Sequence, residues 1–121
     1  MDLVPPSSSD PKVLLPLRSA QRWSHLIHGK PELAYEYLSP EYRAAQNSIE
    51  YATQINGQQV TSTRVNYVGL HCDSSEACNV SLKIEAKLNA PKTDGLETIV
   101  EVDENWVKSE GHWYFVPRAR R

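Results

Sequence analysis

The two cysteines lie close together, between two segments whose residue patterns are strand-like. Cys72 and Cys78 flank the polar stretch Asp-Ser-Ser-Glu-Ala, and each is in phase with the apolar side of its segment. If these segments form a hairpin, a disulfide closing so short a loop would contribute about 2 to 3 kcal/mol. The alternative is a pair of reduced core cysteines in the cytosol. Of these two alternatives we expect the disulfide. Separately, the spacing fits neither a zinc site nor a CxxC redox pair.

Glu104 is the second candidate for a chemical role, because it lies between Val102 and Trp106 on the apolar side of a predicted strand. A carboxylate in that place destabilises the fold unless it is paired or reaches a water-filled pocket. In a pocket it would be a candidate general base. The alternatives are a rim position, a bulge that turns the side chain outward, or a salt bridge with one of three arginines, Arg18, Arg22 and Arg43.

Aromatic residues recur along the chain and could line a pocket or simply pack the core. Together with the glutamate, six residues are candidates for a pocket lining: Trp23, Tyr37, Tyr51, Tyr67, Glu104 and Trp106. His25 and His28 lie three residues apart without an evident third ligand, and we expect them at the surface. The sequence indicates no metal, no cofactor and no phosphate-binding loop.

The first half of the chain has the residue pattern of helices. A first helix is predicted from Pro16 to Gly29, since proline favours a first turn and glycine a stop. We expect its inner stripe to consist of Leu17, Ala20, Trp23, Leu26 and Ile27, and its outer face of Arg18, Gln21, Arg22, Ser24, His25 and His28. A second helix follows Pro31, a turn carries Tyr42, and a third helix runs over 48–57.

The second half changes to the period of two that indicates strands. Strands are predicted over 60–72, 78–88, 98–106 and 112–116, and the second alternates apolar and polar residues throughout. Because all helices precede all strands, the order favours an α+β fold with an antiparallel sheet over alternating βαβ units. We expect the sheet to curl strongly around the helices as a cone.

Two segments resemble nuclear transport factor 2-like domains, which are also described as a cystatin-like fold. The segments are AYEYLSPEYR, which begins at Ala34, and WVKSEGHWYFV, which begins at Trp106; the likeness extends over residues 16–117. The resemblance is to small bacterial exported proteins, many of them lipoproteins, and it implies a cone with a pocket at its open end. Members include isomerases, dehydratases, ligand binders, secretion-system components and dimerisation modules. The Tyr–Asp–Asp set of the ketosteroid-isomerase-like members has no counterpart here.

Length and charge set further bounds. The chain of 121 residues has the size of one domain, and its net charge of −2 offers no overall basic field for nucleic acid. We expect residues 1–12 to be a Pro/Ser-rich tether, 13–117 the domain, and 118–121 a basic tail. A tether, a disulfide and an absent export signal together suggest a periplasmic or lipid-anchored protein whose signal lies upstream of this sequence.

The leading interpretation is therefore a non-enzymatic exported domain that binds a small apolar ligand or a protein partner. The alternatives are a small enzyme of proton transfer that uses Glu104, and a structural part of an envelope assembly that forms a homodimer through its sheet. We predict no nucleic-acid partner and no transmembrane segment.

Overall fold

The computed structural model of the chain describes residues 10–58, 60–89 and 95–117. The predicted basic tail, 118–121, and most of the predicted tether lie outside the described residues.

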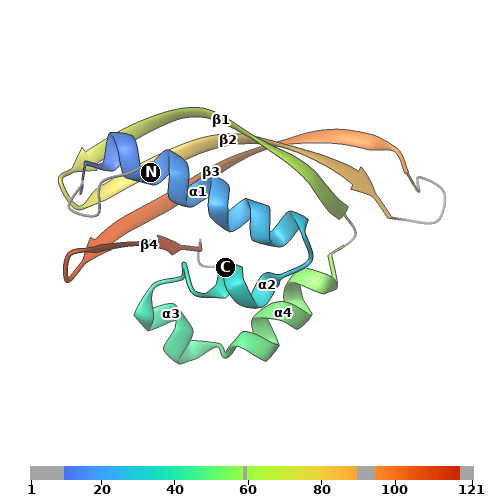
Figure 1. Cartoon of the computed structure of the whole chain (residues 1–121), viewed down its shortest axis with the longest axis horizontal. Helices are drawn as coiled ribbons and strands as arrows, with labels where there is room; N and C mark the ends of the chain where they lie inside the picture. The colour runs from blue at the N-terminus through green and yellow to red at the C-terminus, as the bar shows by residue number, and fades with distance from the viewer. Residues whose placement is uncertain (1–9, 59, 90–94, 118–121) are drawn as a thin grey trace, which may run out of the picture.

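Helices occupy the first half of the chain and strands the second (Figure 1). The helices are α1 (Pro11–Ile27), α2 (Pro31–Tyr35), α3 (Pro40–Ala45) and α4 (Ser48–Asn56). The strands are β1 (Val60–Ser74), β2 (Ala77–Leu88), β3 (Glu97–Ser109) and β4 (His112–Val116). In the part of the chain that the structure describes, no helix has both the length and the apolar character needed to cross a membrane.

Helix α1 begins five residues before the predicted start at Pro16. The Asp10 side chain caps the helix by accepting a hydrogen bond from the Lys12 N–H at 3.0 Å. Pro11 takes the first helical position, where its missing N–H has no cost, and Pro16 lies inside the helix. The prediction of the start was wrong because both Pro11 and Pro16 suit the first turn of a helix, and only Pro11 follows a capping residue.

The four strands form one sheet in the order β1-β2-β3-β4, and every neighbouring pair is antiparallel. On β2, Cys78, Val80, Leu82, Ile84 and Ala86 point to the inner face, which α1 covers, and the residues between them point to the outer face (Figure 1). β1 carries three register shifts, whereas the pairing of β2 with β3 is regular from end to end. Side chains on β3 therefore alternate strictly between the two faces.

The predicted cone is wrong, because the sheet is open. β4 has five residues and pairs with only one end of β3, from Asn105 to Ser109. Beyond β4 the sheet ends on a two-residue contact, in which the Phe115 N–H donates to the Tyr37 carbonyl and the Ser39 N–H donates to the Phe115 carbonyl. Among the described residues no further strand joins β4 to β1, so the sheet twists without closing.

Two apolar clusters form the interior. The larger lies between α1 and the sheet and contains Leu15, Val80, Leu82, Trp106 and Trp113. The smaller joins α2 and α4 and contains Ala34, Tyr35, Leu38 and Tyr51. Phe115 on β4 packs against both clusters and so connects the sheet layer to the small helices.

The buried face of α1 differs from the predicted stripe. Leu15, Ser19 and Arg22 are its buried residues, whereas Ala20 is exposed. Two polar residues thus occupy the position expected for apolar ones, because they have a buried partner on the sheet, as described below.

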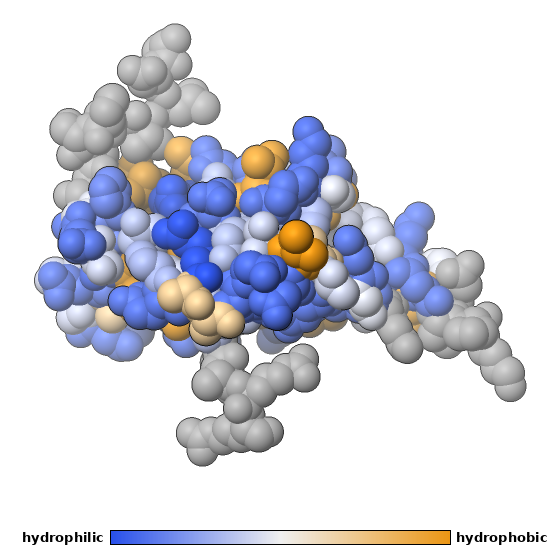
Figure 2. All heavy atoms as spheres, turned by 90° about the horizontal axis from the view of Figure 1, so that it is seen from below, coloured by the Kyte–Doolittle hydropathy of each residue, from blue (hydrophilic) through white to orange (hydrophobic). Residues whose placement is uncertain are grey.

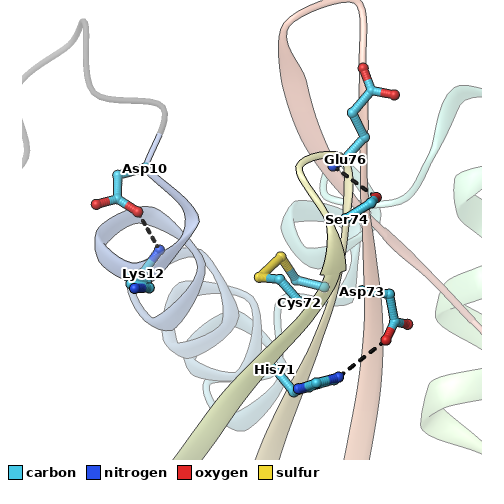
Figure 3. The surroundings of a disulfide bond; sticks show 8 residues. Asp10, Lys12, His71, Cys72, Asp73, Ser74 and Glu76 are labelled. Carbon is cyan, nitrogen blue, oxygen red and sulfur yellow. Dashed lines mark hydrogen bonds and ion pairs between the residues drawn. A yellow bond between two sulfur atoms is a disulfide. The ribbon is translucent and has the colours of Figure 1, made fainter.

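The Cys72–Cys78 disulfide is present in the structure and lies at the end of the β1–β2 hairpin (Figure 3). The two cysteines are directly paired across the hairpin and pack into the larger cluster, on the side of the sheet that faces α1. The hairpin that the sequence pattern predicts brings the two sulfurs together.

Candidate functional site

The Glu104 carboxylate is the centre of the molecule's most concentrated polar network. It lies on the inner face of β3 opposite Val80, and its side chain is almost fully buried, with 2 % of the residue exposed. A carboxylate in such a place must be compensated within the protein, because water cannot reach it.

Four hydrogen-bond donors supply that compensation. Oε1 accepts from the Ser19 hydroxyl at 3.0 Å and from the Trp106 indole Nε1–H at 3.2 Å. Oε2 accepts from Arg22 Nη1 at 2.9 Å and from the Trp23 indole Nε1–H at 2.7 Å. Three of these donors come from α1, at spacings that place them on one side of the helix, and the fourth comes from two residues along β3 itself.

The identity of the donors fixes the direction of these hydrogen bonds. Arginine and indole groups donate and never accept, so the hydrogen bonds from Arg22, Trp23 and Trp106 all run toward Glu104. A carboxylate has about four acceptor positions, and here the same number of donors fills them. No acceptor position remains for a substrate proton, which argues against Glu104 as a general base.

Arg22 extends the network from the sheet to the small helices. Its Nη2 donates to the Tyr51 hydroxyl on α4 at 3.2 Å, and its guanidinium lies 3.9 Å from the centre of the Phe115 ring. Only 5 % of Arg22 is exposed. The positive charge is therefore held between a carboxylate and an aromatic face, both of which favour it.

The structure brings four of the six predicted pocket residues into this network: Trp23, Tyr51, Glu104 and Trp106. Tyr37 lies outside it, where its hydroxyl donates to Gln21 Oε1 at 3.2 Å. Tyr67 is 49 % exposed on β1 and takes no part. These four side chains form a hydrogen-bonded core, and Trp23 also lines the hollow described below.

Sequence reasoning missed Ser19 and assigned Arg22 to the outer face of its helix. A signal was available, since Leu15, Ser19, Arg22 and Leu26 recur at the four- and three-residue intervals of a single helix face. Arg22 was among the three arginines considered as partners of Glu104, and the structure selects it over Arg18 and Arg43. Arg43 instead donates to the Leu38 carbonyl at 3.0 Å.

Arg18 lies beside the network without entering it. Its guanidinium is 4.6 Å from the centre of the Tyr37 ring and 5.8 Å from that of Trp106. Burial lowers the pKa of Arg18, and the neighbouring Tyr37 and Tyr114 oppose that effect. The aromatic contacts thus offset part of the desolvation of the charge.

A hollow of about 310 Å³ opens next to the network, between the C-terminal ends of α1 and α4 and the first residues of β1. Arg22 and Trp23 form part of its wall, so the hydrogen-bonded core supports the hollow from behind. Its apolar lining comes from Trp23, Leu26, Ile27, Ile55 and Val60.

The remaining lining of this α1–α4–β1 hollow is polar but uncharged, from Asn56, Gln58, Thr61, Ser62 and Asn89. Among the described lining residues Arg22 is the sole charged one, and its charge is matched by Glu104. The hollow therefore combines apolar surface with neutral hydrogen-bonding groups, which suits a small uncharged molecule.

The histidines belong neither to the Glu104 network nor to the lining of the α1–α4–β1 hollow. His28 Nδ1 lies 2.7 Å from the Ser24 carbonyl, and His71 pairs with Asp73 at 3.2 Å on the exposed hairpin (Figure 3). Within the described ranges, no group of three histidine, cysteine, aspartate or glutamate side chains is placed to hold a metal ion.

Comparison with solved structures identifies the fold. The chain is similar to the solution structure of a SEC-C motif containing protein from Rhodopseudomonas palustris, with a TM-score of 0.65, 14% sequence identity, and coverage of 83% of this chain and 73% of that one. No protein-family model matches the chain, and no curated protein matches it.

This likeness corrects the family resemblance drawn from the sequence. The nuclear transport factor 2-like, cystatin-like classification is wrong, since the open sheet with helices before it resembles the SEC-C motif protein instead. At this level of identity the likeness establishes a fold and carries no activity to this chain.

Replacing Glu104 tests the network. In Glu104→Gln, Arg22 loses its counter-charge and the new amide directs N–H groups at donors, so we expect the free energy of unfolding to fall by about 3 to 5 kcal/mol. The matched control is Asp103→Asn, one residue away on the exposed outer face, for which we expect little change. Urea unfolding followed by tryptophan fluorescence measures both; equal losses in the two variants would contradict the account.

Proposed function

We propose that this protein is a non-enzymatic binding domain whose ligand site is the α1–α4–β1 hollow. The observation that carries the proposal is that four hydrogen bonds fill the acceptor positions of the Glu104 carboxylate. Glu104 was the one candidate for catalysis, and all its acceptor positions are used within the core. What remains beside it is a hollow with a fixed wall and without a free acid or base among the described lining residues.

The lining selects the ligand class. Five apolar side chains offer contact for a small hydrocarbon or aromatic group, and neutral amide and hydroxyl groups offer hydrogen bonds at the rim. A charged ligand would lose its hydration without gaining a free counter-charge. A small, uncharged, partly apolar molecule is therefore the favoured ligand.

The hollow also has the size for such a ligand. Its volume of about 310 Å³ lies near the lower end of known small-molecule sites. The face seen in Figure 2 is mostly hydrophilic with separate hydrophobic spots, which favours a confined site over a broad apolar docking surface on that side.

Three probes of equal size test the ligand class. Benzyl alcohol, benzoate and benzylamine share a ring and differ in charge, and we expect benzyl alcohol to shift the amide resonances of Asn56, Thr61 and Ser62 at lower concentration than the two ions do. The variant Asn56→Trp fills the hollow and should abolish the shifts. Gln54→Trp, on the same helix but outside the lining, is the matched control.

Two results would contradict the proposal. One is that none of the three probes shifts the hollow at millimolar concentration. The other is that Gln54→Trp abolishes the response as fully as Asn56→Trp does.

The proposal includes export to an oxidising compartment. Its support is the disulfide, which pairs the two cysteines of the chain within one hairpin. We expect protein isolated without reductant to be lighter by two hydrogen atoms than its reduced form, and to be alkylated at Cys72 and Cys78 only after reduction. Intact mass spectrometry measures this, and two freely alkylated thiols in unreduced protein would argue for the cytosol.

A further inference from the structure

The other end of the sheet carries a free edge. β4 covers β3 from Asn105 to Ser109, and the stretch from Glu97 to Asp103 continues beyond it. Figure 1 shows β4 lying beside only one end of the much longer β3. Among residues 10–58, 60–89 and 95–117, no segment pairs with this stretch on the side away from β2.

The register shows which backbone groups point to the free edge. The Phe115 N–H and carbonyl bond to Tyr37 and Ser39, away from β3, so its pairing partner Trp106 directs its own groups to β2. The Lys108 N–H, two residues on, donates to the Glu76 carbonyl beside β2 and agrees with this alternation.

The pairing of β2 with β3 has no register shift, so the alternation continues along the strand. Thr98, Val100 and Val102 bond to β2, whereas Glu97, Ile99, Glu101 and Asp103 direct their N–H and carbonyl groups to the open side. Such a row of unpaired groups is a template for another strand.

The side chains of this row lie on the outer face beside two hollows. One, of about 420 Å³, is lined in part by Glu97 and Ile99, and the other, of about 220 Å³, by Glu101 and Asp103. Both hollows extend from β3 over β2 and β1, on the other side of the row from an added strand, so such a strand would take its affinity from backbone pairing along the edge.

Charge selects the partner. Three of the four residues in the row are acidic, and Ile99 is 63 % exposed among them. From the β2 side, Lys83 lies opposite Glu101, and the Ser81 hydroxyl donates to Asp103 at 2.8 Å. A strand added on the open side would lie beside Glu101 and Asp103 on the side away from β2. Basic residues directly opposite these acids would be favourable.

A second copy of the chain fits poorly. Two β3 edges paired antiparallel about a two-fold axis place acid opposite acid, whether the axis passes through Ile99, Val100 or Glu101. Like charges directly opposite each other destabilise a strand pair. A different sequence is therefore favoured as the occupant over a second copy of the chain.

We propose that the free edge of β3 binds an extended segment of a partner protein, which adds antiparallel to β3 with basic residues opposite Asp103 and Glu101 and an apolar residue opposite Ile99. The site is separate from the α1–α4–β1 hollow, so either proposal can fail without the other.

A synthetic peptide tests the inference. Acetyl-Thr-Arg-Thr-Arg-Thr-Val-Thr-amide places its two arginines and its valine at the required positions, and its control carries glutamate in place of both arginines. We expect the basic peptide to slow amide exchange at Ile99, Glu101 and Asp103, which exchange faster than Val100 and Val102 in the free protein. The control peptide should have no effect.

Charge reversal of the edge provides the matched variant. The double substitution Glu101→Lys and Asp103→Lys lies on the exposed outer face and should weaken binding of the basic peptide by about an order of magnitude, while the control peptide gains binding. Unchanged exchange at Val100 and Val102 verifies that the ladder with β2 is intact.

Three outcomes would overturn the proposal. The basic peptide fails to slow exchange at the odd-numbered positions, or both peptides act alike. The third is that Ile99, Glu101 and Asp103 are already protected in the full chain and lose protection when residues 118–121 are removed, because the edge would then be occupied by the chain itself.

Discussion

A buried carboxylate imposes a requirement for hydrogen-bond partners, and the surrounding helices and strands of this fold meet it. Glu104 lies on the inner face of the sheet, and its charge is tolerable only if every acceptor position is filled. Ser19, Arg22 and Trp23 meet that requirement from α1, so the carboxylate determines both the rotation of α1 about its axis and its position along β3. Arg22 in turn donates a hydrogen bond to the Tyr51 hydroxyl, so the position of α4 also depends on this network. One side chain on the sheet thus orients two helices from different layers.

The buried Glu104 network and the hollow beside it differ in their chemistry. A buried acid beside tryptophans could suggest an enzyme, but four donors already occupy the acceptor positions of this carboxylate. Arg22 and Trp23 of the network form part of the wall of the adjacent hollow, and the rest of its lining is neutral or apolar. The end of β3 beyond Asn105 is open because β4 ends at Val116, which pairs with Asn105. The outer edge of β4 contacts the segment around Leu38. The two binding sites that we propose, the hollow and the free edge, therefore lie at different parts of one open sheet.

Local patterns in the sequence were informative wherever the deciding interactions are local. The alternation from Cys78 to Leu88 predicted β2 and its buried face, and the pairing of Cys72 with Cys78 follows from the short hairpin between them. The anomaly of Glu104 was also visible, because a charge interrupts an apolar face. The predicted cone was wrong because closure depends on how far β4 extends, which no residue pattern in the strands encodes. The inner stripe of α1 was wrong because Ser19 and Arg22 look like surface residues until their partner, more than eighty positions away, is known.

The most direct test of this account is the solvent exchange of the tryptophan indole protons, measured by NMR in the intact protein. If water does not reach the Glu104 carboxylate and all its donors are in place, the Nε1–H protons of Trp23 and Trp106 exchange as slowly as the backbone amides of β2. This holds for Trp23 too, although its side chain is only partly buried. If both indole protons exchange at the rate of an exposed indole, water reaches the carboxylate. The network would then be an open site, and the interpretation of Glu104 as a structural rather than a catalytic group would be wrong.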